Sequence, residues 1–352
     1  MTQEGSRESK IVGQIWSALG VDPKTTPDHL TLGEIGMESM FAIELQQGLE
    51  RDYSIKLSLN DIKNITVKYI KDFESGKIEE FKKFADDIRI AREKLQKIKF
   101  VIPSDAFTRL NSIKTGTPVY FLPPLEGIFA SLEGLAEQMN RPVIGLNWTK
   151  DMGSKTSTVK EISRYYADLL KQIHPKGDYD IVGHFYGALI VTKMLKNKAP
   201  IGRAVIIDMM SGMEVHEEMS SDESLIEMIT SFICKDLPKP IKEKLTRELK
   251  LKNDINGKLT KLSSEIKEFV GKGFVGRDLD NILKNSFQRA KLFTSYRMNM
   301  KNKLKQIKLT AGKKYLEMSG KLLIIKPMAD GNNFSSVASD RIRDLYFLPE
   351  KV

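Results

Sequence analysis

The chain has 352 residues, of which 41% are hydrophobic and 29% are charged, as in a globular protein long enough for two domains. It has no apolar run of the ~20 residues that a membrane span needs, and its polar N-terminus lacks the apolar core of a signal peptide, so we expect a cytoplasmic protein. Cys234 is the only cysteine, which excludes an intrachain disulfide and a cysteine metal cluster, and we expect no metal site.

The net charge of +10 is unevenly distributed. Residues 1–78 hold nine Lys/Arg and twelve Asp/Glu, a balance of −3, so the remainder carries +13. Much of the surplus is Lys interleaved with Glu and Leu between residues 235 and 315, which is typical of solvated helix faces. Because no nucleic-acid-binding motif accompanies it, we expect no nucleic-acid partner.

The first ~78 residues predict a small bundle of helices. Apolar residues recur there at helical spacing: Ile11, Ile15 and Leu19, then Phe41, Leu45 and Leu49, then Ile62, Ile65 and Tyr69. A loop punctuated by Pro and Gly separates the first two runs. Residues 79–116 are charged at first and end in loop residues, which predicts a partly helical linker.

From residue 118 the pattern changes to short apolar runs alternating with amphipathic helices. The runs "VYFL", "VIGL", "YDIVG", "RAVIID" and "KLLIIKP" predict strands. Strands that alternate with helices predict a parallel sheet with crossover connections. Residues 214–310 are helical in pattern and interrupt the alternation, so we expect a helical insertion that forms a lid over a site.

"LGEIGMESM" places Ser39 at the end of a glycine-bearing loop and the start of an amphipathic helix. Such a helix start carries unpaired N–H groups and the positive end of the helix dipole, which favour a phosphate. From these residues alone, a plain N-cap serine is favoured over a modified one.

The longer segment resembles the acyl carrier protein family over about residues 10–75. Gly36, Met37, Glu38, Ser39 and Met40 match the family's Gly-x-Asp-Ser-Leu motif, with Glu for Asp and Met for Leu. "LSLNDIKNITVKYI" matches the segment that follows it. The resemblance implies a carrier domain at 8–78 whose serine receives a covalent 4′-phosphopantetheine from a phosphopantetheinyl transferase and then holds acyl chains as thioesters.

Residues 117–352 resemble the thioesterase domain that ends animal fatty acid synthases, an α/β-hydrolase-type fold. "PLEG", residues 124–127, matches a loop that completes the oxyanion hole, and Gly183, Tyr186 and Gly187 match the nucleophile elbow Gly-x-Ser-x-Gly. Leu125 and Tyr186 are the oxyanion-hole candidates. A carrier followed by this thioesterase is also the order in that synthase, which implies its other domains as partners.

The residues for hydrolysis are not in place. Phe185 occupies the nucleophile position, and no histidine follows His216, although the family's catalytic histidine lies near the domain's end. Asp208 matches the triad aspartate as a possible relic, with Asp330 as the alternative position. We therefore expect a degenerate domain whose C-terminal segment has been lost or is incomplete.

These patterns together predict an acyl carrier of fatty acid biosynthesis fused to a thioesterase-like domain that cannot hydrolyse acyl-carrier thioesters. One alternative is an active thioesterase with a non-standard nucleophile, for which His184 and Tyr186 are the nearest candidates. The other is a non-catalytic acyl-binding or scaffold protein. Oligomeric state and acyl chain length are left open.

Overall fold

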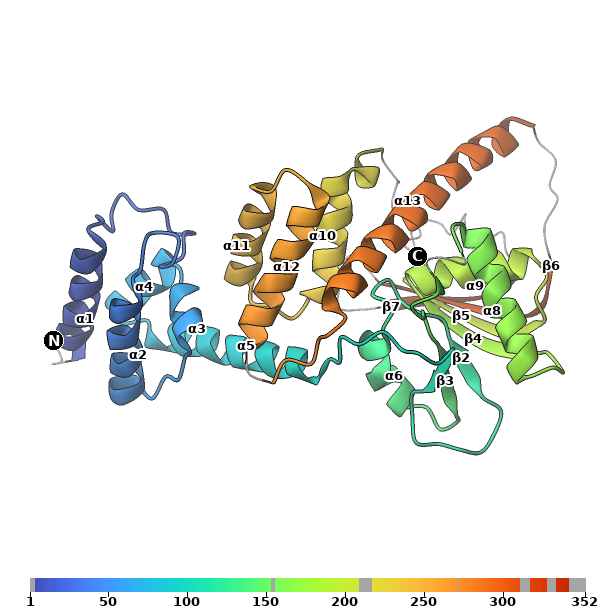
Figure 1. The fold of residues 1–352 in the computed structure, drawn as a ribbon, viewed down its shortest axis with the longest axis horizontal. Helices are drawn as coiled ribbons and strands as arrows, with labels where there is room; N and C mark the ends of the chain where they lie inside the picture. Colours follow the sequence, from blue (N-terminus) through green and yellow to red (C-terminus); the bar gives the residue numbers. More distant parts are fainter. Residues whose placement is uncertain are drawn as a thin grey trace. The chain divides into compact units, whose positions relative to one another are not determined.

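A computed structural model describes residues 4–152, 156–208, 217–271, 273–310, 317–327 and 334–341 (Figure 1). The chain divides into two compact units. Unit 1 comprises Met1–Lys99 and Cys234–Gly276, and unit 2 comprises Phe100–Ile233 and Arg277–Val352. In the part of the chain that is described, no helix combines the length and apolarity needed to cross a membrane.

Unit 1 begins with four helices: α1 (Glu4–Leu19), α2 (Ser39–Tyr53), α3 (Leu59–Lys63) and α4 (Val67–Glu74). The periodic apolar residues form their core, with Ile15, Leu45, Leu49 and Ile62 at most 5% exposed. The helical bundle expected from the sequence is therefore present as secondary structure.

The next helix, α5 (Ile78–Lys97), lies in the segment where the sequence predicted a linker. Its buried face includes Phe81 and Phe84. Phe84 stacks on Tyr69 with ring centroids 4.3 Å apart, and Phe81 lies 5.3 Å from Phe73 of α4. Because its apolar residues repeat on one buried face, α5 belongs to the core of unit 1.

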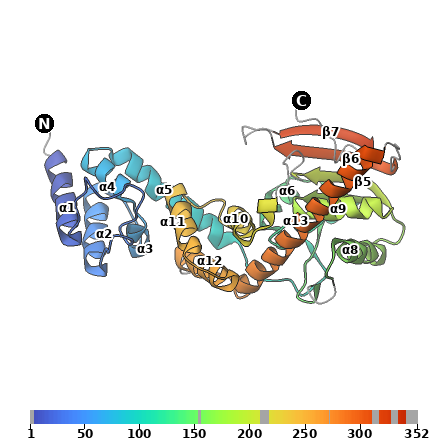
Figure 2. The ribbon, with the colours of Figure 1, turned by 90° about the horizontal axis from the view of Figure 1, so that it is seen from above.

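Two further helices of unit 1, α11 (Lys239–Lys250) and α12 (Ile255–Val270), come from the middle of the expected lid insertion. They form a hairpin, and α12 packs against α5 and α3 (Figures 1 and 2). Their apolar faces, including Leu245, Leu262 and Phe269, are buried. The division differs from the one expected, because residues 234–276 bury this apolar surface in unit 1.

Unit 2 is built on a mixed seven-stranded sheet in the order β1-β3-β2-β4-β5-β6-β7. Its strands are β1 (Phe107–Arg109), β2 (Val119–Phe121), β3 (Val143–Leu146), β4 (Tyr179–His184), β5 (Ile201–Ile207), β6 (Glu317–Pro327) and β7 (Phe334–Arg341). The five inner strands pair in parallel, as the sequence predicted, and the edge strands β1 and β7 are antiparallel. These two edge strands were not expected.

The remaining elements of unit 2 are η1 (Phe129–Ser131), α6 (Glu133–Glu137), α8 (Val159–Ile173), α9 (Tyr186–Lys196), η2 (Glu217–Ser220), α10 (Asp222–Ile233) and α13 (Leu279–Thr310). Helices α8 and α9 pack on each other, α9 covers β4 and β5, and α10 packs on α13. Val119, Phe121, Val143 and Val182 of β2 to β4 lie at the centre of the core. Because β4 is the central strand, this arrangement places its carboxyl end and the start of α9 near the middle of the sheet.

Candidate functional site

The first candidate site is the start of α2, where Ser39 is exposed. Glu38 occupies the N-cap position with extended backbone (φ −73°, ψ 154°), and its side chain makes no capping hydrogen bond. Ser39 is therefore the first helical residue and not the cap. Gly36 has φ 95° and no atom within 4 Å of the position a Cβ would take, so the approach to the helix start is open.

The flanking motif residues divide between core and surface. Met37 is 5% exposed and Met40 is 62% exposed. Met37 thus anchors the loop, while Met40 lies in solvent one residue beyond Ser39.

A lysine from α3 reaches the same point. Lys63 Nζ lies 3.4 Å from Ser39 Oγ. Its ammonium group adds a full positive charge beside the partial positive charge of the helix start, and both favour an anion attached to the serine. Sequence reasoning missed Lys63, because it lies 24 residues from Ser39 and only the fold brings the two together.

Helix α3 is held in place by a capping box and a buried ion pair. Ser58 Oγ accepts a hydrogen bond from Asp61 N at 3.2 Å, and the Asp61 carboxylate accepts one from Ser58 N at 2.8 Å. The Asp61 side chain is fully buried and pairs with Arg92 of α5. Arg92 also donates to the backbone oxygen of Phe269, 2.8 Å away, which ties α3, α5 and α12 together.

The second candidate site is the turn from β4 into α9. Phe185 lies between them with φ 47° and ψ −100°, a strained conformation for a bulky residue. A Cβ on Gly183 would lie 2.6 Å from the backbone of Gly187 and Ala188, and one on Gly187 would lie 3.1 Å from two carbonyl oxygens. Both glycines are therefore required by a tight strand-turn-helix geometry, which is that of a nucleophile elbow.

The space around the elbow residue is filled with aromatic rings. Phe185 is 2% exposed. Its ring stacks on Phe293 of α13 with centroids 4.5 Å apart and tilts against Phe232 of α10 at 4.7 Å. A phenyl ring has no group that could attack a carbonyl or move a proton. The nucleophile position of the elbow is therefore occupied by a packed, unreactive side chain.

The oxyanion-hole candidates face a buried arginine. The backbone oxygen of Leu125 accepts a hydrogen bond from Arg289 Nε at 2.6 Å. Arg289 is 1% exposed and lies over the Trp148 ring, 4.9 Å from its centroid. A Cβ on Gly127 would lie 2.9 Å from Arg289 Nη2, so the glycine of "PLEG" makes room for the guanidinium.

Burial in this region changes two ionisation equilibria. Burial lowers the pKa of Arg289 to about 10, so the guanidinium is still charged at neutral pH. Burial raises the pKa of Tyr186 far above its usual value, and the nearby Arg289 charge offsets this only in part. Tyr186 is therefore a neutral phenol and not a nucleophile. Sequence reasoning missed Arg289, because nothing in "SFQRAK" sets it apart.

Asp208 lies beside the elbow at the carboxyl end of β5. Phe185 N donates to the backbone oxygen of Ile207 at 3.0 Å, and Asp208 N donates to that of Ile325 at 2.8 Å. Asp208 has φ 48°. The structure thus brings Phe185 and Asp208 to one edge of the sheet, while Asp330 falls outside the described residues.

The histidines do not complete a triad in the described part of the chain. His174 contacts Tyr179, at 5.8 Å between rings, where β4 begins. Phe185 follows the other end of that strand. The five residue steps of β4, at ~3.3 Å each, separate the two strand ends by about 17 Å. His184 lies against Phe232 at 6.2 Å, on the residue before the elbow position. His216 lies outside the described residues.

The chain was compared with protein-family models, curated sequences and solved structures. No protein-family model matches the chain. Polyketide synthase PksR of Bacillus subtilis (strain 168) is 24% identical over 226 residues, which are 62% of this chain and 8% of PksR. This chain therefore spans less than a tenth of the curated relative. This sequence similarity is to a polyketide synthase.

The comparison with solved structures gives matches of low identity. The four-domain nonribosomal peptide synthetase AB3403, as holo protein with AMP and glycine, has a TM-score of 0.43 and 16% identity over 80% of this chain and 20% of that one. The NocB thioesterase domain, in covalent complex with a fluorophosphonate nocardicin G analogue, has a TM-score of 0.34 and 14% identity over 53% and 70% of the two chains.

Proposed function

We propose that this chain is an acyl carrier of a fatty acid or polyketide synthase, with Ser39 as the attachment point of a phosphopantetheine arm. We propose further that unit 2, which contains the elbow at Phe185 and is called the elbow unit below, does not hydrolyse the carried thioester. The observation that carries the proposal is the exposed Ser39 hydroxyl at the start of a 15-residue helix with the Lys63 ammonium 3.4 Å away. The carrier motif around Ser39 and the similarity to PksR support it.

The residues present fit a phosphodiester at Ser39. The hydroxyl is in solvent, the open space beside Gly36 admits an arm, and Lys63 together with the first N–H groups of α2 offsets a negative charge. When bound, the arm supplies a thiol that holds acyl groups as thioesters. Ser39 itself would provide only the point of attachment, and Lys63 would offset the charge of the phosphate.

The elbow unit supports the second half of the proposal. Hydrolysis through an acyl-enzyme needs a nucleophile with a base to take its proton. The phenyl ring of Phe185 can act neither as the nucleophile nor as the base, and Tyr186 is a buried phenol whose pKa is raised. We infer that release of the acyl group belongs to another enzyme or domain, as does chain synthesis.

Intact-mass measurement tests the carrier role. The full chain is incubated with coenzyme A and a broad-specificity phosphopantetheinyl transferase, and the transfer joins Ser39 Oγ to the arm's phosphorus while the nucleotide part of coenzyme A leaves. We expect a gain of one phosphopantetheine, located at Ser39 by fragmentation. Ser39→Ala should abolish the gain and Ser75→Ala, a serine after α4, should not. A folded wild-type chain that gains no mass contradicts the proposal.

A second assay tests the elbow unit. The chain is incubated with a fatty acyl thioester of N-acetylcysteamine, and free thiol is followed over time. We expect no release above the buffer background. Release that falls on mutation of His184, Tyr186 or Asp208 would instead support a thioesterase with a non-standard nucleophile.

A further inference from the structure

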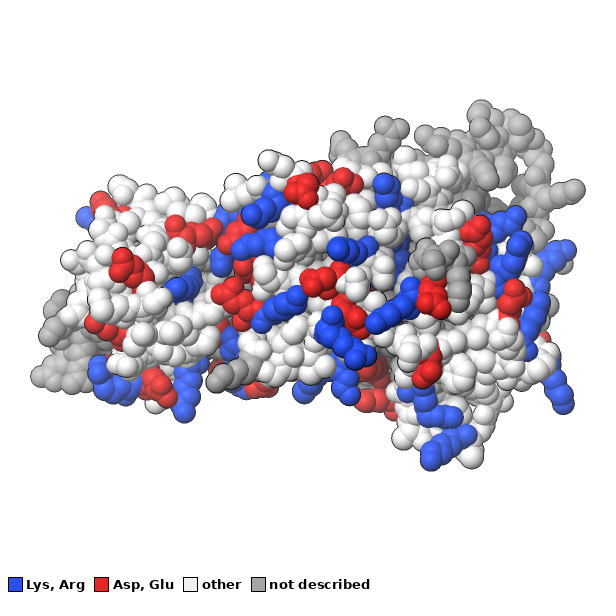
Figure 3. Space-filling view, in the orientation of Figure 1, with Lys and Arg blue, Asp and Glu red and all other residues white. Residues whose placement is uncertain are grey.

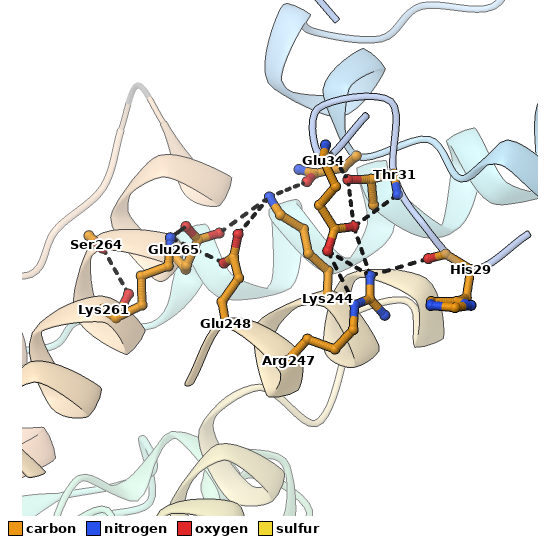
Figure 4. A network of polar contacts seen from close by, with 10 residues as sticks. His29, Thr31, Glu34, Lys244, Arg247, Glu248, Lys261, Ser264 and Glu265 are labelled. Carbon is orange, nitrogen blue, oxygen red and sulfur yellow. Dashed lines mark hydrogen bonds and ion pairs between the residues drawn. The ribbon is translucent and has the colours of Figure 1, made fainter. Parts of the chain in front are cut away.

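The α11–α12 hairpin reaches both segments that frame Ser39 (Figure 4). One segment is the loop at residues 29–37, which leads into α2, and the other is the end of α3, which carries Lys63. Arg247 of α11 contacts the first segment and Lys244 of α11 contacts the second. Both contacts lie within unit 1.

The contact with the loop is a charged, multiple hydrogen bond. Arg247 Nη2 lies 2.8 Å and 3.0 Å from the two Glu34 carboxylate oxygens and 3.2 Å from the backbone oxygen of His29. The same carboxylate accepts hydrogen bonds from the backbone N and the hydroxyl of Thr31, each at 2.9 Å. Glu34 therefore joins the hairpin to the internal bonding of the loop.

Burial alone would raise the pKa of Glu34, but the hydrogen bonds from Arg247 and Thr31 outweigh it and hold the pKa below its usual value. The carboxylate is therefore charged at neutral pH.

The contact with α3 lies next to Lys63. Lys244 Nζ donates to the side-chain oxygen of Asn64 at 2.8 Å, and Asn64 is 3% exposed. The backbone oxygen of Lys63 accepts from Gly33 N at 2.9 Å, which connects the end of α3 to the loop. The 29–37 loop and the end of α3 thus form one hydrogen-bonded unit, called the Ser39 frame below, which includes Lys63 and leads into Ser39. The hairpin contacts this frame at two points.

The charges on the two sides are complementary. Residues 239–270 hold nine Lys/Arg and five Asp/Glu, a balance of +4, against −3 for residues 1–78. On the face that Figure 3 shows, blue Lys and Arg side chains are interspersed with red acidic ones. Glu248 and Glu265 lie within 4.0 Å of Lys244, and Lys261 lies 3.1 Å and 2.7 Å from the same two carboxylates. This fixed network directs Lys244 toward Asn64.

The two contacts differ in kind from the rest of the joint between hairpin and bundle. Arg92 lies 5.2 Å from the centroid of the Phe269 ring and donates to its backbone oxygen; the Arg92 side chain is 23% exposed and its partner Asp61 is fully buried. The Arg247 contact is an ion pair with 30% of the Arg247 side chain exposed, and the Lys244 contact is a charged hydrogen bond to Asn64 with 16% of the Lys244 side chain exposed. Salt weakens peripheral ion pairs far more than buried packing.

We propose that the α11–α12 hairpin is an electrostatic clasp on the Ser39 frame: Arg247 and Lys244 hold the 29–37 loop and the end of α3, and loss of their two contacts loosens the frame while the Arg92 joint stays closed. This goes beyond the carrier proposal and does not require Ser39 to be modified. It assigns a part of the expected lid insertion to holding the segments that frame Ser39 within the same unit.

Amide hydrogen exchange read by mass spectrometry tests the clasp on the intact chain. We expect the peptides covering 29–37 and 59–66 to exchange about three- to tenfold faster in Arg247→Gln/Lys244→Gln than in wild type. Lys239→Gln is the matched control, because Lys239 lies on the same helix and its ammonium lies near Glu243 of that helix, 3.8 Å away. Arg247→Lys keeps the charge but not the double contact and should fall between the two.

Salt gives a second, mutation-free arm. In wild type, exchange at 29–37 should rise between low and 1 M salt, and in the double variant it should not. Peptides of α5 and of the central strands serve as the folding control and should exchange equally in all proteins. The clasp is ruled out if the double variant matches Lys239→Gln, or if salt leaves the 29–37 peptide unchanged. Neither readout involves Ser39 loading, so failure of the carrier proposal remains distinguishable.

Discussion

Phe185 and Phe293 stack face to face, with ring centroids 4.5 Å apart and planes at 25°, so that the residue at the elbow is held by a helix from the far end of the chain. Phe232 adds a third ring from α10. The elbow position therefore holds part of an aromatic core and no reactive side chain.

Restoring a serine at the elbow should not restore hydrolysis. Phe185→Ser supplies a hydroxyl but no base, and it removes a buried ring from the stack. We expect no thioester hydrolysis above background and a loss of about 3–5 kcal/mol in the stability of unit 2. Stability is followed by the fluorescence of Trp148 in a Trp16→Phe background. Phe107→Ser, at a site 48% exposed, is the control and should change little. Hydrolysis by the folded variant would show that a base lies nearby after all.

The elbow should not tolerate a methyl group on its first glycine. In Gly183→Ala the new Cβ would lie 2.6 Å from backbone atoms of Gly187 and Ala188, which cannot move aside without opening α9. We expect a loss of about 3 kcal/mol, measured by urea denaturation. Gly134→Ala is the matched control, because no atom lies within 4 Å of its new Cβ and Gly134 is inside helix α6. That control should be neutral or stabilising by ~0.5–1 kcal/mol. Equal effects of the two substitutions would contradict a tight elbow.

The joint at Arg92 should carry much of the stability of unit 1. Arg92→Gln leaves the fully buried Asp61 carboxylate without its cation and removes the bond to Phe269. We expect a loss on the order of 3 kcal/mol, since an unpaired buried charge is costly. Trp16 reports on unit 1 in a Trp148→Phe background. Arg89→Gln, one turn earlier on α5 and paired only with exposed acids, should cost under ~1 kcal/mol. A small effect at Arg92 would mean that packing alone holds α12.

Unit 2 should lose stability in acid through Asp180. Burial alone would raise the pKa of Asp180, but hydrogen bonds from Arg203 and Arg141 outweigh it and hold the pKa below the usual value. A carboxyl whose folded pKa is depressed stabilises the fold above its unfolded pKa, and this contribution is lost as the pH falls from about 5 through the folded pKa.

The measurement for Asp180 is the urea midpoint of Trp148 fluorescence between pH 7 and pH 3. The wild-type curve should fall more steeply than that of Asp180→Asn, and the two should converge at the acid end. Glu133→Gln, on the exposed side of α6, should run parallel to wild type. If the curve of Asp180→Asn instead runs parallel to that of the wild type, Asp180 does not contribute to the loss of stability in acid.

Local patterns predicted the elements that bury their own apolar residues. The runs at β2 to β6 are hydrophobic and separated by amphipathic helices, so their parallel pairing followed from order and length. The sequence did not predict the two edge strands. Strand β1 has only three residues, all exposed, and the sequence of β7 is mostly polar, so neither shows the apolar run of a buried strand. Helix α5 was predicted as part of a partly helical linker because its charges are frequent, although Phe81 and Phe84 repeat on one face.

Contacts between distant segments could not be read from the sequence. The candidate residues Ser39, Phe185 and Asp208 came from motifs, but Lys63, Arg92, Arg247 and Arg289 came from none. Each of these cations acts through a partner 24 to 213 residues away, and such pairs depend on which faces the fold brings together.

The discontinuity of unit 1 has a consequence for synthesis on the ribosome. Domains generally fold as they emerge, N-terminal part first. Here the first 99 residues must wait for residues 234–276, and at ~5–20 residues per second that delay is on the order of 10–35 s. During this interval the faces of α3 and α5 that α12 will cover are open to water and to other proteins. The exit of the hairpin from the ribosome therefore ends the exposure of these faces to aggregation and proteolysis.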